Sequence, residues 1–292
     1  MRWLFLFCFS FTELQLETVS KAFHITLKHT RRWGFIALTF KVEQMIDNST
    51  KLNLSTSAPL AGMQCYQQPF LSVYLSDCLP IMRTFNNKQF DLAIVDVPYG
   101  IGEDGSKNHT RSKLAVSKNY KAYAGNDTNA PEAEYWNELL RISKNQIVWG
   151  ANHFISKLPY DSSCWIVWDK DNGDSDFADC ELAWTSFDKA VRKVKWKWAG
   201  MLQQNMKEKQ ERIHPNEKPI QLYEWLLKNY AKQGDKIIDT HFGSGSIALA
   251  VDKVNKLDKM DLHLTAIEMD EYYYEKSINR ITTKLCQGTL SF

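Results

Sequence analysis

The sequence lacks the patterns that mark metal centres and disulfide frameworks. It contains six scattered cysteines: Cys8, Cys65, Cys78, Cys164, Cys180 and Cys286. None of them forms a C-x-x-C pair, and the seven histidines show no cluster with the spacing of zinc ligands. We therefore expect no metal and no disulfide, and we interpret the cysteines as reduced, mostly buried thiols of a cytoplasmic protein.

The sequence also lacks a long hydrophobic run and a strong net charge. No stretch reaches the roughly 20 apolar residues of a membrane-spanning helix. The apolar residues after Arg2 faintly resemble the start of a signal peptide, but Glu13 interrupts them and no cleavage site follows. Because the net charge is only +2, any contact with nucleic acid must depend on a local patch. We expect a soluble protein without a membrane partner.

Two parts can be distinguished along the 292 residues. Residues 1–62 are interpreted as an N-terminal extension of unknown role, with a predicted hairpin over 23–42 and a Ser/Thr/Asn-rich linker over 47–62. The composition and length of the whole chain suit one large α/β domain or one and a half domains, and the recognisable domain is expected over residues 63–292.

In the second part, strand-like runs alternate with helical ones. Strands are predicted at 71–75, 92–95, 146–149, 165–168, 181–187, 237–239 and 264–268, and helices at 131–142, 217–231, 246–257 and 271–285. This alternation predicts a mainly parallel sheet with helices on both faces. Ligands bind at the carboxyl ends of the strands in such sheets.

Four carboxylates follow or end predicted strands: Asp77, Asp96, Asp239 and Glu268. They are expected along one edge of the sheet. The alternative is that acidic residues merely cap helices at strand-to-helix turns.

The tetrapeptide Asp96-Val97-Pro98-Tyr99 places a carboxylate, a constrained carbonyl and an aromatic ring in succession. Pro98 restricts Val97 to extended geometry. The Asp96 carboxylate and the Val97 carbonyl can then accept hydrogen bonds from one planar NH2 group while Tyr99 stacks on the ring that bears it. Methyl transfer to an exocyclic amine needs such acceptors, because the nitrogen lone pair is delocalised into the ring. An ordinary Pro-Tyr-Gly turn is the alternative.

A glycine turn follows a second strand, at Gly243-Ser244-Gly245. Glycines allow a tight turn and close approach of a ligand. Asp239 lies just before the turn and can accept from an ammonium group, and Glu268 ends the next strand at a spacing that suits ribose hydroxyls. The third glycine of the dinucleotide motif is absent, which favours another nucleoside cofactor over NAD.

The ordered set of motifs over about residues 70–285 resembles the beta class of amino DNA methyltransferases, especially small phage-like members. The resemblance is carried by Asp96–Tyr99, by His214-Pro215-Asn216-Glu217-Lys218-Pro219, by residues 239–245 and by Glu268. The segments 149–154 and 165–170 are similar to the small members.

The resemblance implies a circularly permuted, Rossmann-like methyltransferase fold, with S-adenosylmethionine as methyl donor and double-stranded DNA as substrate. It assigns Asp96 and Tyr99 to the target base. The cofactor is assigned to Asp77, Lys218, Asp239, His241, Gly243, Ser244, Gly245 and Glu268. Adenine N6 is favoured over cytosine N4, since the motif begins with Asp rather than Ser.

The sequence departs from the family pattern in the Asp96–Tyr99 motif and in the glycine motif. Val97 replaces the usual first proline, which keeps the carbonyl but reduces backbone rigidity. Thr240 and His241 replace the usual proline and phenylalanine. Histidine can still pack flat against a ligand, but a strand-end histidine bonded to the backbone is equally compatible with the sequence.

Two basic stretches, 107–121 and 189–212, flank the predicted base site in sequence. Their candidate DNA contacts are Lys113, Lys118, Arg192, Lys193, Lys195 and Lys197. A target base must be flipped out of the duplex to be reached, and target recognition is expected within 171–212. The alternative is a solvated face, with 193–198 forming an edge strand.

Other functions stay open at this point. They are methylation of cytosine N4, of RNA or of a protein amide, a degenerate DNA-binding relic, and a nicotinamide-dependent oxidoreductase, which would leave Asp96 to Tyr99 without a role. The sequence does not decide whether the protein forms a homodimer or is paired with a restriction endonuclease.

Overall fold

The computed structural model describes residues 63–102, 127–172, 178–199, 202–207 and 209–289. The predictions for residues 1–62, and those for Lys113 and Lys118, lie outside these residues. The strands are β1 (Cys65–Gln68), β2 (Leu71–Leu75), β3 (Phe90–Val95), β4 (Ser143–Trp149), β5 (Trp165–Asp169), β6 (Cys180–Thr185), β7 (Arg192–Lys195), β8 (Trp198–Ala199), β9 (Leu202–Gln203), β10 (Lys236–Asp239) and β11 (His263–Glu268). The α-helices are α2 (Cys78–Thr84), α3 (Ala133–Ile142), α4 (Ile220–Tyr230), α5 (Ser246–Asp258) and α6 (Glu271–Thr289).

Nine of these strands form one sheet in the order β1-β2-β11-β10-β3-β4-β6-β5-β7. The five strands from β2 to β4 in this order are parallel to one another, whereas β1 and β6 pair antiparallel with their neighbours. The predicted α/β, Rossmann-like fold with a mainly parallel sheet is therefore confirmed.

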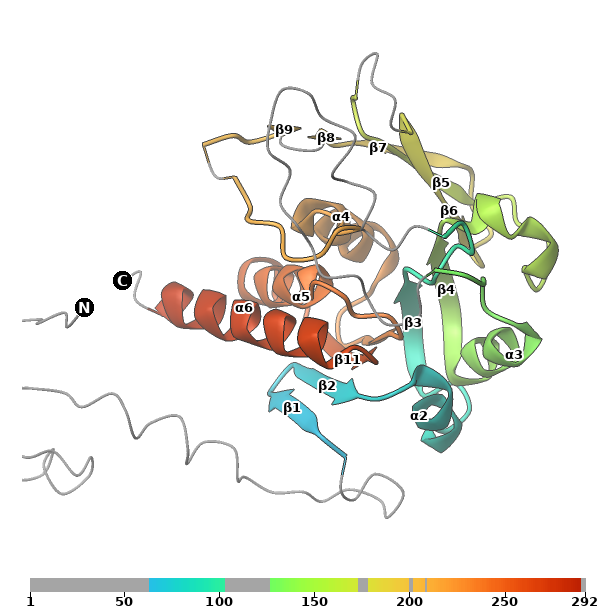
Figure 1. Cartoon of the computed structure of the whole chain (residues 1–292), viewed down its shortest axis with the longest axis horizontal. Coiled ribbons are helices and arrows are strands. Elements are labelled where there is room, and N and C mark those ends of the chain that lie inside the picture. The colour runs from blue at the N-terminus through green and yellow to red at the C-terminus, as the bar shows by residue number, and fades with distance from the viewer. Residues whose placement is uncertain (1–62, 103–126, 173–177, 200–201, 208, 290–292) are drawn as a thin grey trace, which may run out of the picture. The chain divides into compact units, whose positions relative to one another are not determined.

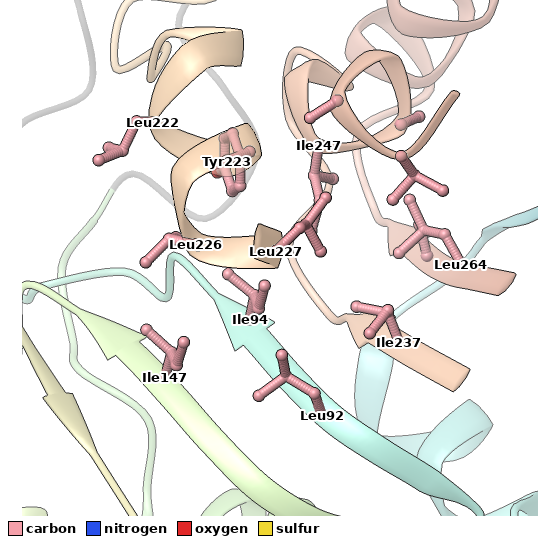
Figure 2. Packing of buried hydrophobic residues seen from close by; sticks show 14 of the residues in the cluster. Leu92, Ile94, Ile147, Leu222, Tyr223, Leu226, Leu227, Ile237, Ile247 and Leu264 are labelled. Atoms are coloured by element: carbon pink, nitrogen blue, oxygen red, sulfur yellow. The ribbon is translucent and has the colours of Figure 1, made fainter. Parts of the chain in front are cut away.

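Helices cover both faces of the sheet (Figure 1). Parallel strands that are buried on both faces read as continuous apolar runs, and 92–95 and 237–238 are such runs. On one face α4 and α5 pack on β3, β4 and β10, where Leu226 and Leu227 lie over Ile94 and Ile237 (Figure 2). On the other face α2 and α3 enclose a second core that contains Ile81, Leu139 and Ile238.

The chain changes direction across the sheet between β10 and β3. From β3 it crosses through α3 to β4 on one side, and from β10 it crosses through α5 to β11 on the other side. The carboxyl ends of two parallel strands that diverge in this way leave a crevice in which ligands bind in doubly wound sheets. Here those ends carry Asp96 and Asp239.

The structure corrects three sequence predictions. Helix α4 begins at Ile220 rather than at Glu217, with Pro219 as its N-cap residue, because the residue before a proline is disfavoured in helical geometry. Helix α2 and strand β1 were not predicted. Of the five described cysteines only Cys164 is buried, and Cys180 and Cys286 are exposed, so the prediction of mostly buried thiols is wrong.

Within the described ranges, no helix is long and apolar enough to cross a membrane. The same ranges contain no group of three or more His, Cys, Asp or Glu side chains arranged to hold a metal ion.

Candidate functional site

The four predicted carboxylates lie on consecutive parallel strands. In sheet order, Asp77 follows β2, Glu268 ends β11, Asp239 ends β10 and Asp96 follows β3. The register pairs Leu75 with Glu268 and Asp239 with Ala266, so these strands end at one edge. The four side chains therefore lie along one edge of the sheet, as the sequence predicted, although their contacts differ.

The glycine turn links β10 to α5 and is tied to the next strand. Gly243 and Gly245 both have positive φ angles, 53° and 70°, which glycine adopts without a steric penalty. A Cβ at Gly245 would also lie 3.1 Å from Ile281 Cδ1. Glu268 accepts a hydrogen bond from Gly243 N through Oε2 at 2.7 Å and from Asp270 N through Oε1 at 2.9 Å. Glu268 thus fixes the turn, and its position stays compatible with a ligand because each carboxylate oxygen has a second lone pair.

Asp239 is a buried carboxyl group at the end of β10. It is 2% exposed, and its Oδ1 accepts a hydrogen bond from His241 N at 3.0 Å. Burial raises its pKa to about 8, opposed by that hydrogen bond and reinforced by the nearby charges of Asp96 and Glu268. A carboxyl group in this state gains a large stabilisation when a cation is placed against it.

Ser244 is buried inside the turn. Its hydroxyl is 3.0 Å from the Ser246 hydroxyl, and its carbonyl accepts from the Arg280 guanidinium at 3.0 Å. Through these bonds the turn is attached to the start of α5 and to α6.

Asp96 lies in a buried network of charges rather than free in the crevice. Its Oδ1 accepts a hydrogen bond from the Tyr99 hydroxyl at 2.8 Å, and its Oδ2 is 2.5 Å from Lys218 Nζ. Lys218 Nζ also donates to the Tyr99 hydroxyl at 3.2 Å. Burial disfavours the charge on Lys218, but Asp96 and Glu181 outweigh it and raise its pKa, so Lys218 is protonated at neutral pH.

The family resemblance assigns Lys218 to the cofactor, whereas the structure places its ammonium group against Asp96. Its charge also lowers the pKa of Asp239, so Lys218 lies between the two halves of the site. Lys218 precedes Pro219 and lies just outside α4, and from this position its side chain reaches Asp96.

The Tyr99 ring is stacked on the exposed ring of His153, with 5.2 Å between centroids and an interplanar angle of 14°. A side chain at Gly150 would collide with the same ring. Tyr99 is therefore held between neighbouring groups, with one face of its ring stacked on His153. Val97 is 1% exposed and packs into the core beside the motif.

Asp127 was not recognised from the sequence, although it controls the shape of the motif loop. Its Oδ1 accepts hydrogen bonds from Tyr99 N at 2.5 Å and Gly100 N at 2.9 Å, and its Oδ2 accepts from Ile101 N at 3.3 Å. Asp127 is 3% exposed. Three consecutive amide groups around one carboxylate form an anion-binding nest, here filled by the protein itself.

Replacing Asp127 by alanine is expected to destabilise the protein by about 2–3 kcal/mol, because buried amides lose a charged acceptor. Asp127→Asn keeps one acceptor oxygen and should lose about half as much. Urea denaturation measures both values. The exposed Asp179→Ala serves as control, and an equal stability of Asp127→Ala and this control would contradict the role of the carboxylate.

Thr240 and His241, which depart from the family pattern, form a network with α3. The Thr240 hydroxyl lies 2.7 Å from the Tyr135 hydroxyl and 2.9 Å from His241 Nδ1. The rings of Tyr135 and His241 meet edge to face at 5.7 Å. Burial lowers the pKa of His241 to about 4, with the nearby charge of Asp77 opposing this shift, so the ring is neutral at pH 7. The structure therefore places a neutral aromatic ring beside the turn.

Asp77 is exposed and serves as the N-cap of α2, accepting a hydrogen bond from Leu79 N at 2.9 Å. For this residue the helix-capping alternative describes what the structure shows. The charge of Asp77 still raises the pKa of His241, so Asp77 lies near the His241 ring.

The predicted DNA contacts on β7 lie at the edge strand of the sheet, as the alternation in 193–198 predicts. The order of the sheet separates β7 from β3 by β4, β6 and β5. Three of the lysines have an acidic neighbour: Lys193 is 3.3 Å from Asp169, and Lys195 and Lys197 are 2.8 and 3.8 Å from Asp171. These pairs offset part of the positive charge, and the four basic side chains do not converge on Asp96.

Comparison with known proteins gives a family model described as DNA methylase, which matches residues 168–279. The match contains Lys218, the glycine turn and Glu268, and it covers less than half of the chain. Among solved structures, the M1.HpyAVI–SAM complex shares 18% sequence identity over 72% of this chain and 99% of that chain, with a TM-score of 0.43. The PvuII DNA methyltransferase, described as cytosine-N4-specific, shares 11% identity over 72% of this chain and 86% of that chain, with a TM-score of 0.44.

Proposed function

We propose that this protein is an S-adenosylmethionine-dependent DNA methyltransferase that methylates the exocyclic amine of a flipped base, with adenine N6 as the preferred acceptor. The observation that carries the proposal is the adjacency of two sites at the switch point of the sheet. Asp96 and Tyr99 follow β3, and Asp239 and the glycine turn follow β10, its parallel neighbour. The match of residues 168–279 to a DNA methylase model supports the same assignment.

The residues at the end of β10 fit the proposed cofactor. Asp239 is a buried carboxyl with a raised pKa, which suits an ammonium group. Glu268 lies beside the turn and suits ribose hydroxyls, and the backbone is accessible at Gly243, where an added Cβ would meet no atom closer than 3.9 Å. When bound, S-adenosylmethionine supplies an electrophilic methyl group on a sulfonium.

The residues after β3 fit the acceptor. The Asp96 carboxylate and the Val97 carbonyl accept from the target amine and draw its lone pair out of the ring, while Tyr99 stacks on the base. With the cofactor bound, Asp96 and Val97 would hold the amine nitrogen toward the methyl group, and the proton that the nitrogen gives up on methylation would leave to water past Asp96. The preference for adenine rests on Asp96 as the first residue of the motif.

Double-stranded DNA is the proposed substrate, with base flipping to bring the amine to Asp96. Lys113, Lys118, Arg192, Lys193, Lys195 and Lys197 are the proposed phosphate contacts. Because β7 is far from β3 in the sheet order, its lysines would touch DNA away from the target base rather than at it.

Expression in a host without DNA methylation, followed by sequencing that detects modified bases, tests the proposal. Methylated adenine at one sequence motif is the expected result. Methylated cytosine would move the acceptor to N4, and methylated RNA with unmodified DNA would reject the proposed substrate. Unmodified nucleic acids with a folded protein that binds S-adenosylmethionine would favour the relic.

Cofactor binding is expected to release close to one proton at about pH 6.5, where Asp239 is protonated in the free protein and the ligand amine is charged. The ammonium group lowers the Asp239 pKa, so the carboxyl must lose its proton. Because the free-state pKa is about 8, the affinity should rise with pH up to about that value. Titration calorimetry in two buffers of different ionisation enthalpy measures the number of protons.

The matched variant for this experiment is Asp239→Asn, which cannot titrate. It should bind more weakly and release no proton at the same pH. An equal proton release from wild type and Asp239→Asn would assign the titration to another group.

A further inference from the structure

A line of four buried or half-buried charges extends away from Tyr99, and the proposed reaction does not use its far end. Lys218 Nζ lies 2.5 Å from Asp96 Oδ2 and 3.2 Å from Glu181 Oε2. Glu181, on β6, is ion-paired through its other oxygen to Lys170. The chain of contacts is therefore Lys170–Glu181–Lys218–Asp96.

The charged groups at the near end of this line are close to one another. The ammonium group of Lys218 has three N–H donors, and three acceptors surround it: Asp96, Glu181 and the Tyr99 hydroxyl. Both oxygens of Asp96 have a partner, Tyr99 at Oδ1 and Lys218 at Oδ2. A target amine therefore has to share the Asp96 oxygens with Tyr99 and Lys218, through the second lone pair of an oxygen.

Glu181 is the group that can retain Lys218 when this happens. Its carboxylate is fixed from the other side by Lys170, whose side chain is only 16% exposed. Burial disfavours the charge on Glu181, but Lys218 and Lys170 together lower its pKa to about 2, so it is ionised at neutral pH. Lys218 is only 3% exposed, and a charge so little solvated needs a carboxylate partner.

We propose that Glu181 is a positioning residue for methyl transfer, because it holds Lys218 and thereby leaves Asp96 able to accept the target amine. This inference rests on the proposed function and deepens it. Without the Glu181 charge, Asp96 is left to balance the charge of Lys218, and Asp96 becomes a poorer acceptor for the substrate.

The variant that tests the inference is Glu181→Gln, compared with wild type in single-turnover transfer of a labelled methyl group. The substrate is DNA from a methylation-free host. The rate at saturating DNA and cofactor should fall about 10- to 100-fold, by weakened stabilisation of the reacting amine. The cofactor dissociation constant should change less than about threefold, since the carboxylates of the turn are untouched.

The pH–rate profile separates positioning from a purely structural role. The negative charge of Glu181 raises the pKa of Asp96, in addition to the larger effect of burial. Glu181→Gln should therefore move the acidic limb of the profile to lower pH. A loss of stability alone would lower the amount of active enzyme and leave this limb in place.

Two further variants keep the test decisive if Glu181→Gln folds poorly. Lys170→Gln leaves the Glu181–Lys218 contact in place but removes the second cation beside Glu181, so its rate should lie between those of wild type and Glu181→Gln. The double variant Lys170→Gln/Glu181→Gln preserves the net charge but removes that contact, and it should be as slow as Glu181→Gln. Asp258→Asn, in an exposed pair with Lys228, is the control for a generic loss of an ion pair.

The outcomes distinguish this inference from the proposed function. If wild type transfers no methyl group to DNA under any condition, the proposed function fails. If wild type is active and both Glu181 variants match its rate and pH profile, the positioning role alone is overturned.

Discussion

Asp96→Asn should slow methyl transfer about 10²- to 10³-fold, because the acceptor that draws out the amine lone pair loses its charge. The effect should appear in the single-turnover rate. The cofactor dissociation constant should stay within about threefold, since burial, and not the Asp96 charge, is the main cause of the raised Asp239 pKa. The amide still offers one oxygen to the Tyr99 hydroxyl, so the local structure is retained.

Asp91→Asn is the matched control, because Asp91 lies in the same strand β3 near its opposite end. Asp91 pairs with Lys144 at 2.6 Å and accepts from Lys236 N, away from the crevice. This variant should transfer methyl groups within about twofold of wild type, since surface pairs contribute little. Equal rates for Asp96→Asn and Asp91→Asn would remove Asp96 from the reaction.

The elements of the fold were predictable because they depend on local patterns. The apolar runs at β3 and β10 and the helical spacing of α3 and α5 each appear within a short window of sequence. Helix α2 was not predicted, because it is short and contains Pro80. Its N-cap residue, Asp77, also has the position of a ligand-binding carboxylate at a strand end. Strand β1 is an edge strand of four residues without an apolar run.

The carboxylates of the site were predictable for the same reason, since strand ends in a parallel sheet share one edge. Their partners were not. Lys218 meets Tyr99 across 119 positions of sequence, and Asp127 reaches Tyr99 across 28. No local pattern marks Glu181 or Lys170, whose role depends on the antiparallel pairing of β5 and β6 that brings Trp168 opposite Glu181. Such contacts are set by tertiary packing rather than by periodicity.

Lys218→Met is expected to reduce stability by about 3 kcal/mol at pH 8 and to abolish transfer, because it leaves two carboxylates close together without their shared cation. Asp96 and Glu181 then carry uncompensated negative charge in a poorly solvated region. Lys218 is 3% exposed, and the side chains of Asp96 and Glu181 are 20% and 22% exposed. Urea unfolding followed by circular dichroism measures the loss.

The penalty should depend on pH in a defined direction. Lys218 lowers the pKa of both carboxyls, so its removal raises their pKa in the folded state relative to wild type. A carboxyl with a raised folded-state pKa stabilises the fold below its unfolded pKa, and this contribution is lost as pH rises through the folded value. The difference between Lys218→Met and wild type should therefore be smaller at about pH 5 than at pH 8, by at least about 1 kcal/mol.

Lys228→Met provides the comparison, because Lys228 forms an exposed pair with Asp258 at 2.8 Å. It should cost less than about 0.5 kcal/mol at either pH, as exposed pairs do. A penalty for Lys218→Met that is equally large at both pH values would mean that packing of the lysine stem, rather than its charge, stabilises the site. A pH-dependent penalty would instead show that the charge of Lys218 stabilises Asp96 and Glu181 in the folded protein, and this charged arrangement is the one that the target amine has to enter.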